Sequence, residues 1–336
     1  MSLSPDAHEG PHARPSDRGR DRSPLPQLSG DLFITDGGLE TSVIFQQGID
    51  LVDFAAFTLL ESDEGRRALR RYFDPYFQLA EARQVGLVLD TPTWRANLDW
   101  GARQGYDRAA MAACNERAVR FVEQVAGDWP DVQTVVDGVL GPRGDGYVVE
   151  TTMSVSDAAR YHSLQTDAFA AAGAAMVTAV TMTYVEEAIG ITVAAGEADL
   201  PAVISFTVET DGRLPSGQPL GEAVQQVDEV SDAAPAYFMV NCAHPTHFDH
   251  VLQSGGSWIR RVRGLRTNAS ALSHAELDEA TELDRGDIGD LAGRCADLCE
   301  VLPGLAVIGG CCGTDHEHVA AFTDAVQRRQ AATGQR

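Results

Sequence analysis

Short β-branched runs alternate with helix-like segments along the whole chain after residue 30. The runs hold consecutive apolar residues without polar alternation, which is typical of strands buried on both faces of a parallel sheet. The pattern predicts strands at 32–36, 86–91, 133–138, 176–182, 202–207, 237–242, 261–267 and 305–310. Helical spacing lies between these runs, for example at 64–84, 108–127, 157–173, 185–196 and 288–301.

This alternation predicts the α/β class and, within it, a (β/α)8 TIM barrel, because eight β-α units in about 300 residues match that fold in size and count. A doubly wound sheet would give a similar pattern. However, the stretch after the first predicted strand reads TDGGLET and lacks the G-x-G-x-x-G phosphate loop of that fold. We therefore favour one barrel over residues 31–330. Residues 1–30 are rich in Pro, Ser, Arg and Asp, without an apolar run, and are expected to form a disordered tail.

The composition excludes several classes of function. A net charge of −23 argues against a nucleic-acid partner, which needs a basic face. The chain contains no lysine, which removes lysine Schiff bases, pyridoxal phosphate anchoring and P-loop chemistry. We expect no membrane span and no signal peptide, because no segment is apolar enough. A cytoplasmic protein with small-molecule partners is expected, and the oligomeric state stays open.

In such a compartment the cysteines are expected to be reduced, so a cysteine cluster indicates a metal or catalysis. Cys242 ends the sixth predicted strand, and Cys311 and Cys312 follow the eighth. Because the catalytic residues of barrels lie at the carboxyl ends of strands, these three sulfurs are expected to meet. Three thiolates suit Zn²⁺ with an open fourth position. Their charge disfavours activation of water but would keep a fourth thiol deprotonated, which favours alkylation of that thiol.

Other interpretations of the cysteines stay open at this point. A vicinal pair is compatible with plain packing or with a strained disulfide between Cys311 and Cys312. Cys295 and Cys299 are spaced i, i+4 on a predicted helix, so they are either a rival ligand pair or residues of the apolar core.

Five histidines follow the sixth and eighth predicted strands. His244, His247 and His250 form an H-x-x-H-x-x-H pattern that does not suit one helical face. His316 and His318 are expected to cap or begin the last helix. Contact of one of the first three with the cysteine site is the less favoured interpretation.

Three motifs together resemble the homocysteine S-methyltransferase family, which includes betaine-dependent and S-methylmethionine-dependent enzymes. They are TDGGLET at 35–41, NCAH at 241–244 and GGCCGT at 309–314, and the resemblance spans about residues 31–326. It implies a (β/α)8 barrel with zinc held by Cys242, Cys311 and Cys312. Homocysteine would supply the fourth sulfur and take a methyl group from a donor, giving methionine.

The resemblance also implies how homocysteine is held. Asp36 would accept a hydrogen bond from the ammonium group, and the backbone N–H groups near Gly37 and Gly38 would hold the carboxylate. Asn241, beside the first cysteine, would complete the substrate-binding residues. A carboxylate suits an ammonium group, and glycine allows a close approach of the backbone.

One departure from the family concerns Val180, which stands where a glutamate that also contacts the ammonium is expected. Its loss would cost about 1.5–3 kcal/mol of charge-assisted hydrogen bonding. Glu186 and Glu187 follow, but both are expected to be helical and displaced. The acceptor is therefore either homocysteine or another thiol. A non-catalytic zinc- or thiol-binding protein is the further alternative, and a closed fourth ligand such as Cys295 or a histidine would mark it.

The methyl donor must already carry an activated methyl group, on a sulfonium or a quaternary ammonium. Such cations suit an acidic, aromatic-lined mouth. Loops at the predicted strand ends supply aromatic and basic candidates for a donor site: Trp94, Trp100, Tyr147 and Tyr184, with Arg143 or Arg213 for a donor carboxylate.

Overall fold

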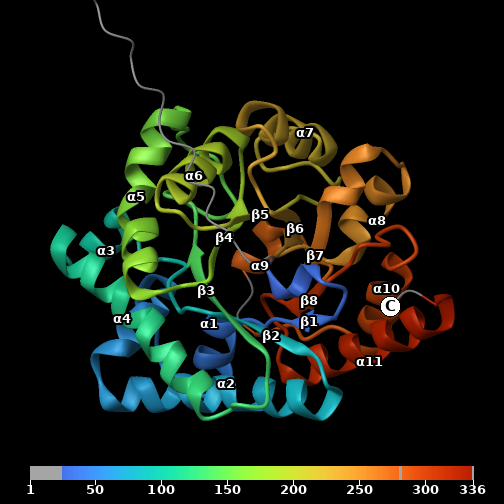
Figure 1. The fold of residues 1–336 in the computed structure, drawn as a ribbon, viewed down its shortest axis with the longest axis horizontal. Coiled ribbons are helices and arrows are strands. Elements are labelled where there is room, and N and C mark those ends of the chain that lie inside the picture. Colours follow the sequence, from blue (N-terminus) through green and yellow to red (C-terminus); the bar gives the residue numbers. More distant parts are fainter. Residues whose placement is uncertain (1–24, 280–281, 335–336) are drawn as a thin grey trace, which may run out of the picture.

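The computed structural model describes residues 25–279 and 282–334, and eight parallel strands close into a barrel there (Figure 1). Each strand pairs with its neighbours in the sequence, and β1 pairs with β8, so the sheet has no free edge. The strands are β1 Phe33–Ile34, β2 Gly86–Asp90, β3 Thr134–Leu140, β4 Met176–Met182, β5 Ala202–Phe206, β6 Tyr237–Asn241, β7 Val262–Thr267 and β8 Val307–Gly310. The predicted barrel is thus confirmed, and each strand lies within its predicted run or within a few residues of it.

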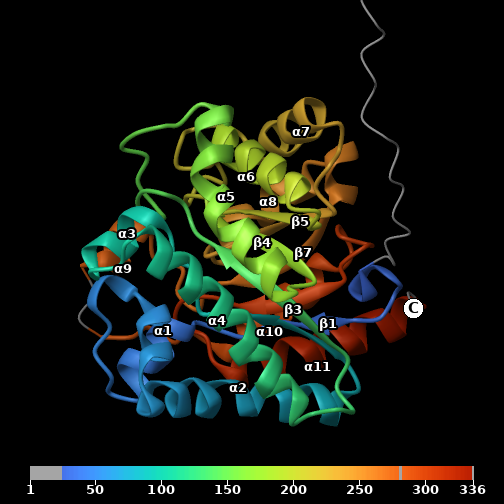
Figure 2. The same cartoon turned by 60° about the vertical axis from the view of Figure 1, so that its left-hand side comes forward.

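Helices surround the barrel, and each strand is followed by one of the longer ones. These are α2 Asp63–Arg83, α4 Arg108–Gly127, α5 Val155–Ala172, α6 Val185–Glu197, α7 Leu220–Ser231, α8 Pro245–Gln253, α10 Ile288–Leu298 and α11 His316–Thr333. The shorter α1 Leu39–Thr41, α3 Leu98–Arg103 and α9 His274–Asp278 belong to loops that follow strands β1, β2 and β7. These three lie on the same side of the barrel (Figure 2).

Local sequence signals explain where the helices begin. The side chains of Ser62, Asp107 and Ser154 accept hydrogen bonds from backbone N–H groups in the first turns of α2, α4 and α5. Such caps satisfy donors that have no partner inside the helix. Gly173 directly follows the last residue of α5, and its φ of +95° is a conformation that glycine adopts without strain.

The inside of the barrel changes from apolar to polar along its axis. Alternate strand residues point inward, and the first inward layer is apolar, with Phe33, Val88 and Val135 among its members. Two residues further along β2 and β3, the inward positions are Asp90 and Asp137. The carboxyl ends of the strands therefore carry the polar groups, and the site is expected there.

The apolar end of the barrel is covered by the segment before β1. Leu25 packs on the apolar inward layer, and buried Gln27 donates a hydrogen bond to the hydroxyl of Tyr237 (3.2 Å). Of the predicted tail, residues 1–24 lie outside the described residues. Within the described part of the chain, no helix has the length and apolar character needed to cross a membrane.

Candidate active site

The three cysteines singled out by the sequence meet at the carboxyl end of the barrel. The Sγ atoms of Cys242, Cys311 and Cys312 all lie within 4.8 Å of one another, and those of Cys242 and Cys312 are 3.6 Å apart. Cys242 follows β6, and Cys311 and Cys312 follow β8. Only β7 lies between these two strands in the barrel, so their carboxyl ends lie close together. Three adjacent thiol groups form a donor set that fits a soft divalent metal ion.

Cys242 is held in an unusual backbone conformation, with a φ of +54°. Its carbonyl oxygen accepts hydrogen bonds from Asn268 Nδ2 (3.1 Å) and His274 Nε2 (2.7 Å). A left-handed conformation of a non-glycine residue costs free energy, and such strain is typical of functional sites. His274 in α9 was missed by the sequence analysis, because its separation of 32 residues from Cys242 gives no local signal.

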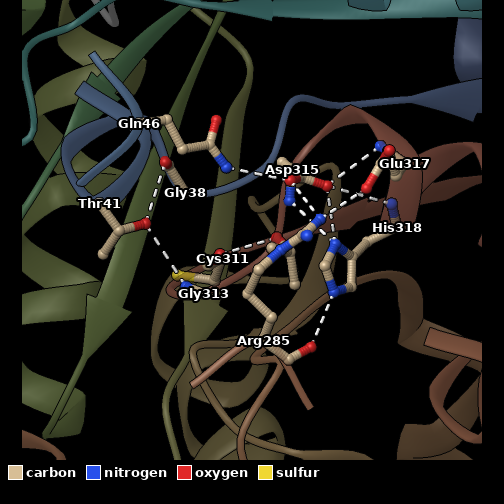
Figure 3. A network of polar contacts seen from close by, with 10 residues as sticks. Gly38, Thr41, Gln46, Arg285, Cys311, Gly313, Asp315, Glu317 and His318 are labelled. Carbon is tan, nitrogen blue, oxygen red and sulfur yellow. Dashed lines mark hydrogen bonds and ion pairs between the residues drawn. The ribbon is translucent and has the colours of Figure 1, made fainter. Parts of the chain in front are cut away.

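The turn after β8 packs directly against the turn after β1 (Figure 3). The hydroxyl of Thr41 donates to the carbonyl of Gly38 (3.1 Å) and accepts from the N–H of Gly313 (3.4 Å). A Cβ atom on Gly38 would lie 2.7 Å from the carbonyl oxygen of Cys311, and Gly313 has a φ of +79°. Glycine is therefore required at both positions, once for close approach and once for its conformation.

A polar network behind the cysteine turn fixes the start of α11 (Figure 3). Asp315 caps this helix and contacts His318 Nδ1 (2.8 Å), Arg285 (2.6 Å) and Gln46 (3.0 Å). Burial opposes ionisation, but pairing with His318 and Arg285 holds the pKa of Asp315 below its usual range. The prediction that His316 and His318 begin or cap the last helix is confirmed.

Tyr147 lies against the cysteine cluster. Its hydroxyl is 3.0 Å from Cys242 Sγ and 3.8 Å from Cys312 Sγ, and its ring lies 4.3 Å from that of His274. Burial and the neighbouring sulfurs raise the pKa of Tyr147, so the phenol stays protonated and can donate to a thiolate. The structure therefore places this predicted donor-site residue directly at the cysteines.

A cavity of about 380 Å³ opens above the cluster. All four predicted substrate-binding residues line it, together with Val180 and one of the predicted donor-site tryptophans. Its lining includes Asp36, Gly37, Gly38, Trp94, Tyr147, Val180, Asn241, Cys311 and Cys312. The lining also includes charged residues that the sequence analysis did not single out, namely Glu40, Asp90, Arg95, Asp145, Arg266, Glu282 and Asp284.

Arg143 and Tyr184, predicted for the donor site, line a separate cavity of about 270 Å³. Arg143 pairs with Asp99 (2.7 Å), and the hydroxyl of Tyr184 accepts from the N–H of Met153 (3.0 Å). Glu187 lines this second cavity as well and does not reach the first. No carboxylate of α6 thus lines the first cavity to replace the one missing at Val180.

Asn241 and the other cysteines and histidines have structural partners. Asn241 Oδ1 accepts hydrogen bonds from the N–H of Thr181 (2.9 Å) and the hydroxyl of Ser205 (2.6 Å). These bonds connect β6 with β4 and β5. Cys295 and Cys299 are buried in the core and lie outside the metal-compatible group. Nor do His244, His247 and His250 belong to that group.

Asp36 lies in a buried layer of charged groups. Arg266 donates to both Asp36 and Asp90, and the hydroxyl of Tyr72 donates to the second oxygen of Asp36 (3.0 Å). Burial raises the pKa of Asp36 to about 8, although Arg266 opposes this. Burial and the neighbouring charge of Asp90 also raise the pKa of Asp137.

The raised pKa of Asp36 predicts a pH dependence of stability. Between the usual pKa of 3.8 and about 8, the folded chain binds a proton that the unfolded chain has released. Raising the pH through this window therefore destabilises the folded chain, by up to about 1.4 kcal/mol per pH unit. Urea unfolding at pH 6 and pH 8 should show wild type losing stability relative to Asp36→Asn. Equal pH dependence of the two proteins would contradict this.

Comparisons with known proteins agree with this fold. Solved structures of the homocysteine methyltransferase MmuM from Escherichia coli share the fold. The metallated form is 20% identical with a TM-score of 0.67, over 88% of this chain and 96% of that chain. The oxidised form is 19% identical with a TM-score of 0.68, over the same shares of both chains.

No curated protein matches the chain in sequence. The family model for homocysteine S-methyltransferase, however, matches residues 33–326, from the first strand into the last helix. Because this match covers the barrel and all three cysteine positions, the chain belongs to the homocysteine S-methyltransferase family and is an enzyme of methyl transfer.

Proposed function

We propose that the chain is a zinc-dependent S-methyltransferase that transfers a methyl group from a small sulfonium or quaternary ammonium donor to homocysteine, giving methionine. The observation that carries this proposal is the convergence of the Sγ atoms of Cys242, Cys311 and Cys312 within 4.8 Å of one another, beside a cavity that Cys311 and Cys312 line. Family membership supports methyl transfer to homocysteine.

The cysteine cluster would hold the metal through its three sulfurs, and Zn²⁺ is the ion that such a set favours. When bound, zinc would lower the pKa of the acceptor thiol and keep it a thiolate. The hydroxyl of Tyr147 lies 3.0 Å from Cys242 Sγ and 3.8 Å from Cys312 Sγ, where it would donate to the thiolates and offset part of their negative charge. Its neighbour His274 holds the carbonyl of Cys242, which fixes the orientation of that ligand.

The reaction forms a bond between the thiolate sulfur and the methyl carbon as the bond from that carbon to the donor heteroatom breaks. The electron pair stays with the heteroatom, so a cationic donor becomes neutral. Aromatic side chains at the cavity, Trp94 and Tyr147 with Phe45 and Phe54 at the rim, suit such a cation. Exclusion of water by these rings would also favour transfer between two small molecules.

A different thiol acceptor is the second candidate. Val180 lines the cavity where a second ammonium-binding carboxylate was expected, and Asp36 is already engaged by Arg266. An acceptor without an amino group would fit these two observations. A permanent fourth cysteine ligand, which would favour a non-catalytic protein, is not present in the metal-compatible group found among residues 25–279 and 282–334.

Zinc K-edge X-ray absorption on the purified, zinc-loaded protein tests the proposal. Without substrate we expect three sulfurs and one lighter ligand, and with homocysteine we expect four sulfurs. A three-sulfur shell that homocysteine does not change, while another thiol converts it to four, would favour the second candidate. Absence of any zinc–sulfur shell would contradict the zinc site itself.

A further inference from the structure

We propose that Glu40 and Arg95 form the clamp that recognises the acceptor, with Glu40 binding its α-ammonium group and Arg95 its α-carboxylate. This inference rests on the proposed function and deepens it. It assigns the recognition of an amino acid to two residues outside the Asp-Gly-Gly turn. Both residues line the cavity above the cysteines.

The groups first expected to bind the amino acid are occupied in the structure. Both oxygens of Asp36 accept hydrogen bonds, one from Arg266 and one from Tyr72. An ammonium group at Asp36 would also lie next to the guanidinium group of Arg266, which repels it. The N–H of Gly38 donates to the carbonyl of Thr314 (3.0 Å) and is not available to a carboxylate. Val180 offers no charge.

Glu40 lines the cavity, and no other side chain of the described residues donates a hydrogen bond to its carboxyl group. It is the second residue of α1, directly after the Asp-Gly-Gly turn. Within the described residues its only polar contact is with its own backbone N–H. Burial raises the pKa of Glu40 to about 7, and Arg95 and Arg266 oppose this shift. Glu40 lines the same cavity as these two arginines and Cys311. An ammonium group is the natural partner of such a carboxylate.

Arg95 is a buried cation whose hydrogen bonds are largely unmade. It is 7% exposed, and its guanidinium group lies between the rings of Trp94 (4.2 Å) and Trp100 (3.7 Å). Among residues 25–279 and 282–334 its Nε has no hydrogen-bond partner, Nη1 donates to the carbonyl of Gly144 at 3.3 Å, and Nη2 lies 4.0 Å from Asp145. A guanidinium group carries five N–H donors, so a carboxylate would satisfy several of them at once.

Glu40 and Arg95 carry opposite charges in one cavity, yet no ion pair within 4.0 Å joins them in the described chain. A zwitterionic amino acid placed between them would satisfy both charges. In homocysteine the α-carbon follows the sulfur by two methylene groups, so a thiol at the cysteines carries its ammonium and carboxylate groups into this cavity. The clamp therefore fits an amino-acid thiol better than an uncharged one.

Analogues that lack one charge each provide the test. We would titrate homocysteine, 4-mercaptobutanoate (which lacks the amine) and 3-mercaptopropylamine (which lacks the carboxylate) into zinc-loaded protein by calorimetry, without donor. Glu40→Gln is expected to weaken the binding of homocysteine and 3-mercaptopropylamine about ten- to hundredfold and to leave the binding of 4-mercaptobutanoate unchanged. Arg95→Gln is expected to weaken the binding of homocysteine and 4-mercaptobutanoate and to leave the binding of 3-mercaptopropylamine unchanged.

Two matched variants serve as controls. Glu186→Gln removes an exposed glutamate at the start of α6 that does not line the cavity. Arg103→Gln removes a second arginine that lies over the Trp100 ring (4.9 Å) but pairs with Asp53 outside the cavity. Both controls should bind all three thiols like wild type. Zinc content and thermal unfolding, measured on each variant, separate lost recognition from lost folding.

Equal weakening of all three thiols in Glu40→Gln, or no weakening of homocysteine in either variant, would overturn the clamp. So would unchanged acceptor binding accompanied by a raised KM for the donor alone. Failure of wild type to bind homocysteine at zinc is a separate result, which would overturn the proposed function instead. The crossed pattern across the two variants is the result that supports the clamp.

Discussion

Replacing Cys312 by serine is expected to remove zinc and methyl transfer together. The remaining sulfurs of Cys242 and Cys311 would hold the ion with two thiolates, and a serine hydroxyl is not ionised at neutral pH. We expect zinc affinity to fall on the order of 10³-fold and methyl transfer to fall at least as far. Zinc content after dialysis against a chelator and the rate of methionine formation measure the two effects.

Cys299→Ala is the matched control, because Cys299 is buried in the core, with 2% of its surface exposed, and lies outside the sulfur cluster. It should keep its zinc and its activity while losing some stability from the deleted sulfur. A Cys312→Ser protein that retains zinc through dialysis and still forms methionine would contradict the three-cysteine site. A Cys299→Ala protein that loses zinc would do the same.

Replacing Arg266 by methionine is expected to destabilise the folded chain by about 3–5 kcal/mol. Arg266 is 7% exposed and donates to both Asp36 and Asp90, so its removal leaves buried carboxyl groups without their cation. The loss should be larger at pH 8 than at pH 5, because burial raises the pKa of Asp36 to about 8 and this carboxyl group is neutral at the lower pH. Urea unfolding at both values measures it.

Arg70→Met provides the comparison for a surface ion pair. Arg70 and Asp128 are 2.5 Å apart but largely solvated, with 37% and 63% of their side chains exposed. Loss of this ion pair should lower the free energy of unfolding by no more than about 1 kcal/mol. If Arg266→Met lowers the free energy of unfolding by as little, the buried layer of charged groups does not depend on Arg266 for its stability. Combining Arg266→Met with Asp36→Asn should recover part of the stability, because one uncompensated carboxyl group is then absent.

The cysteine site was readable from the sequence because its signals are local. Cys311 and Cys312 stand between glycines at a strand end, and Cys242 ends another strand run, so the barrel rule alone predicts that they meet. The strands themselves were readable because a parallel barrel buries both faces and leaves uninterrupted apolar runs.

The contacts of the charged cavity residues could not be predicted from the sequence in the same way. Arg266 contacts Asp36 across 230 positions of the chain, and Arg95 lies in a loop where its burial between two tryptophan rings leaves no sequence pattern. Tyr147 was predicted for the donor side, while its contact with Cys242 arises only because the β3 loop folds over the barrel mouth.

The sequence by itself determined the barrel, the order of its strands and the three sulfurs at its mouth, because periodicity and strand-end position are properties of neighbouring residues. Only the tertiary structure decided which charges in the cavity are paired. Asp36 is engaged by Arg266, whereas Glu40 and Arg95 remain without strong partners. Pairing depends on distances between side chains from different strands and loops, and these distances are set when the barrel closes.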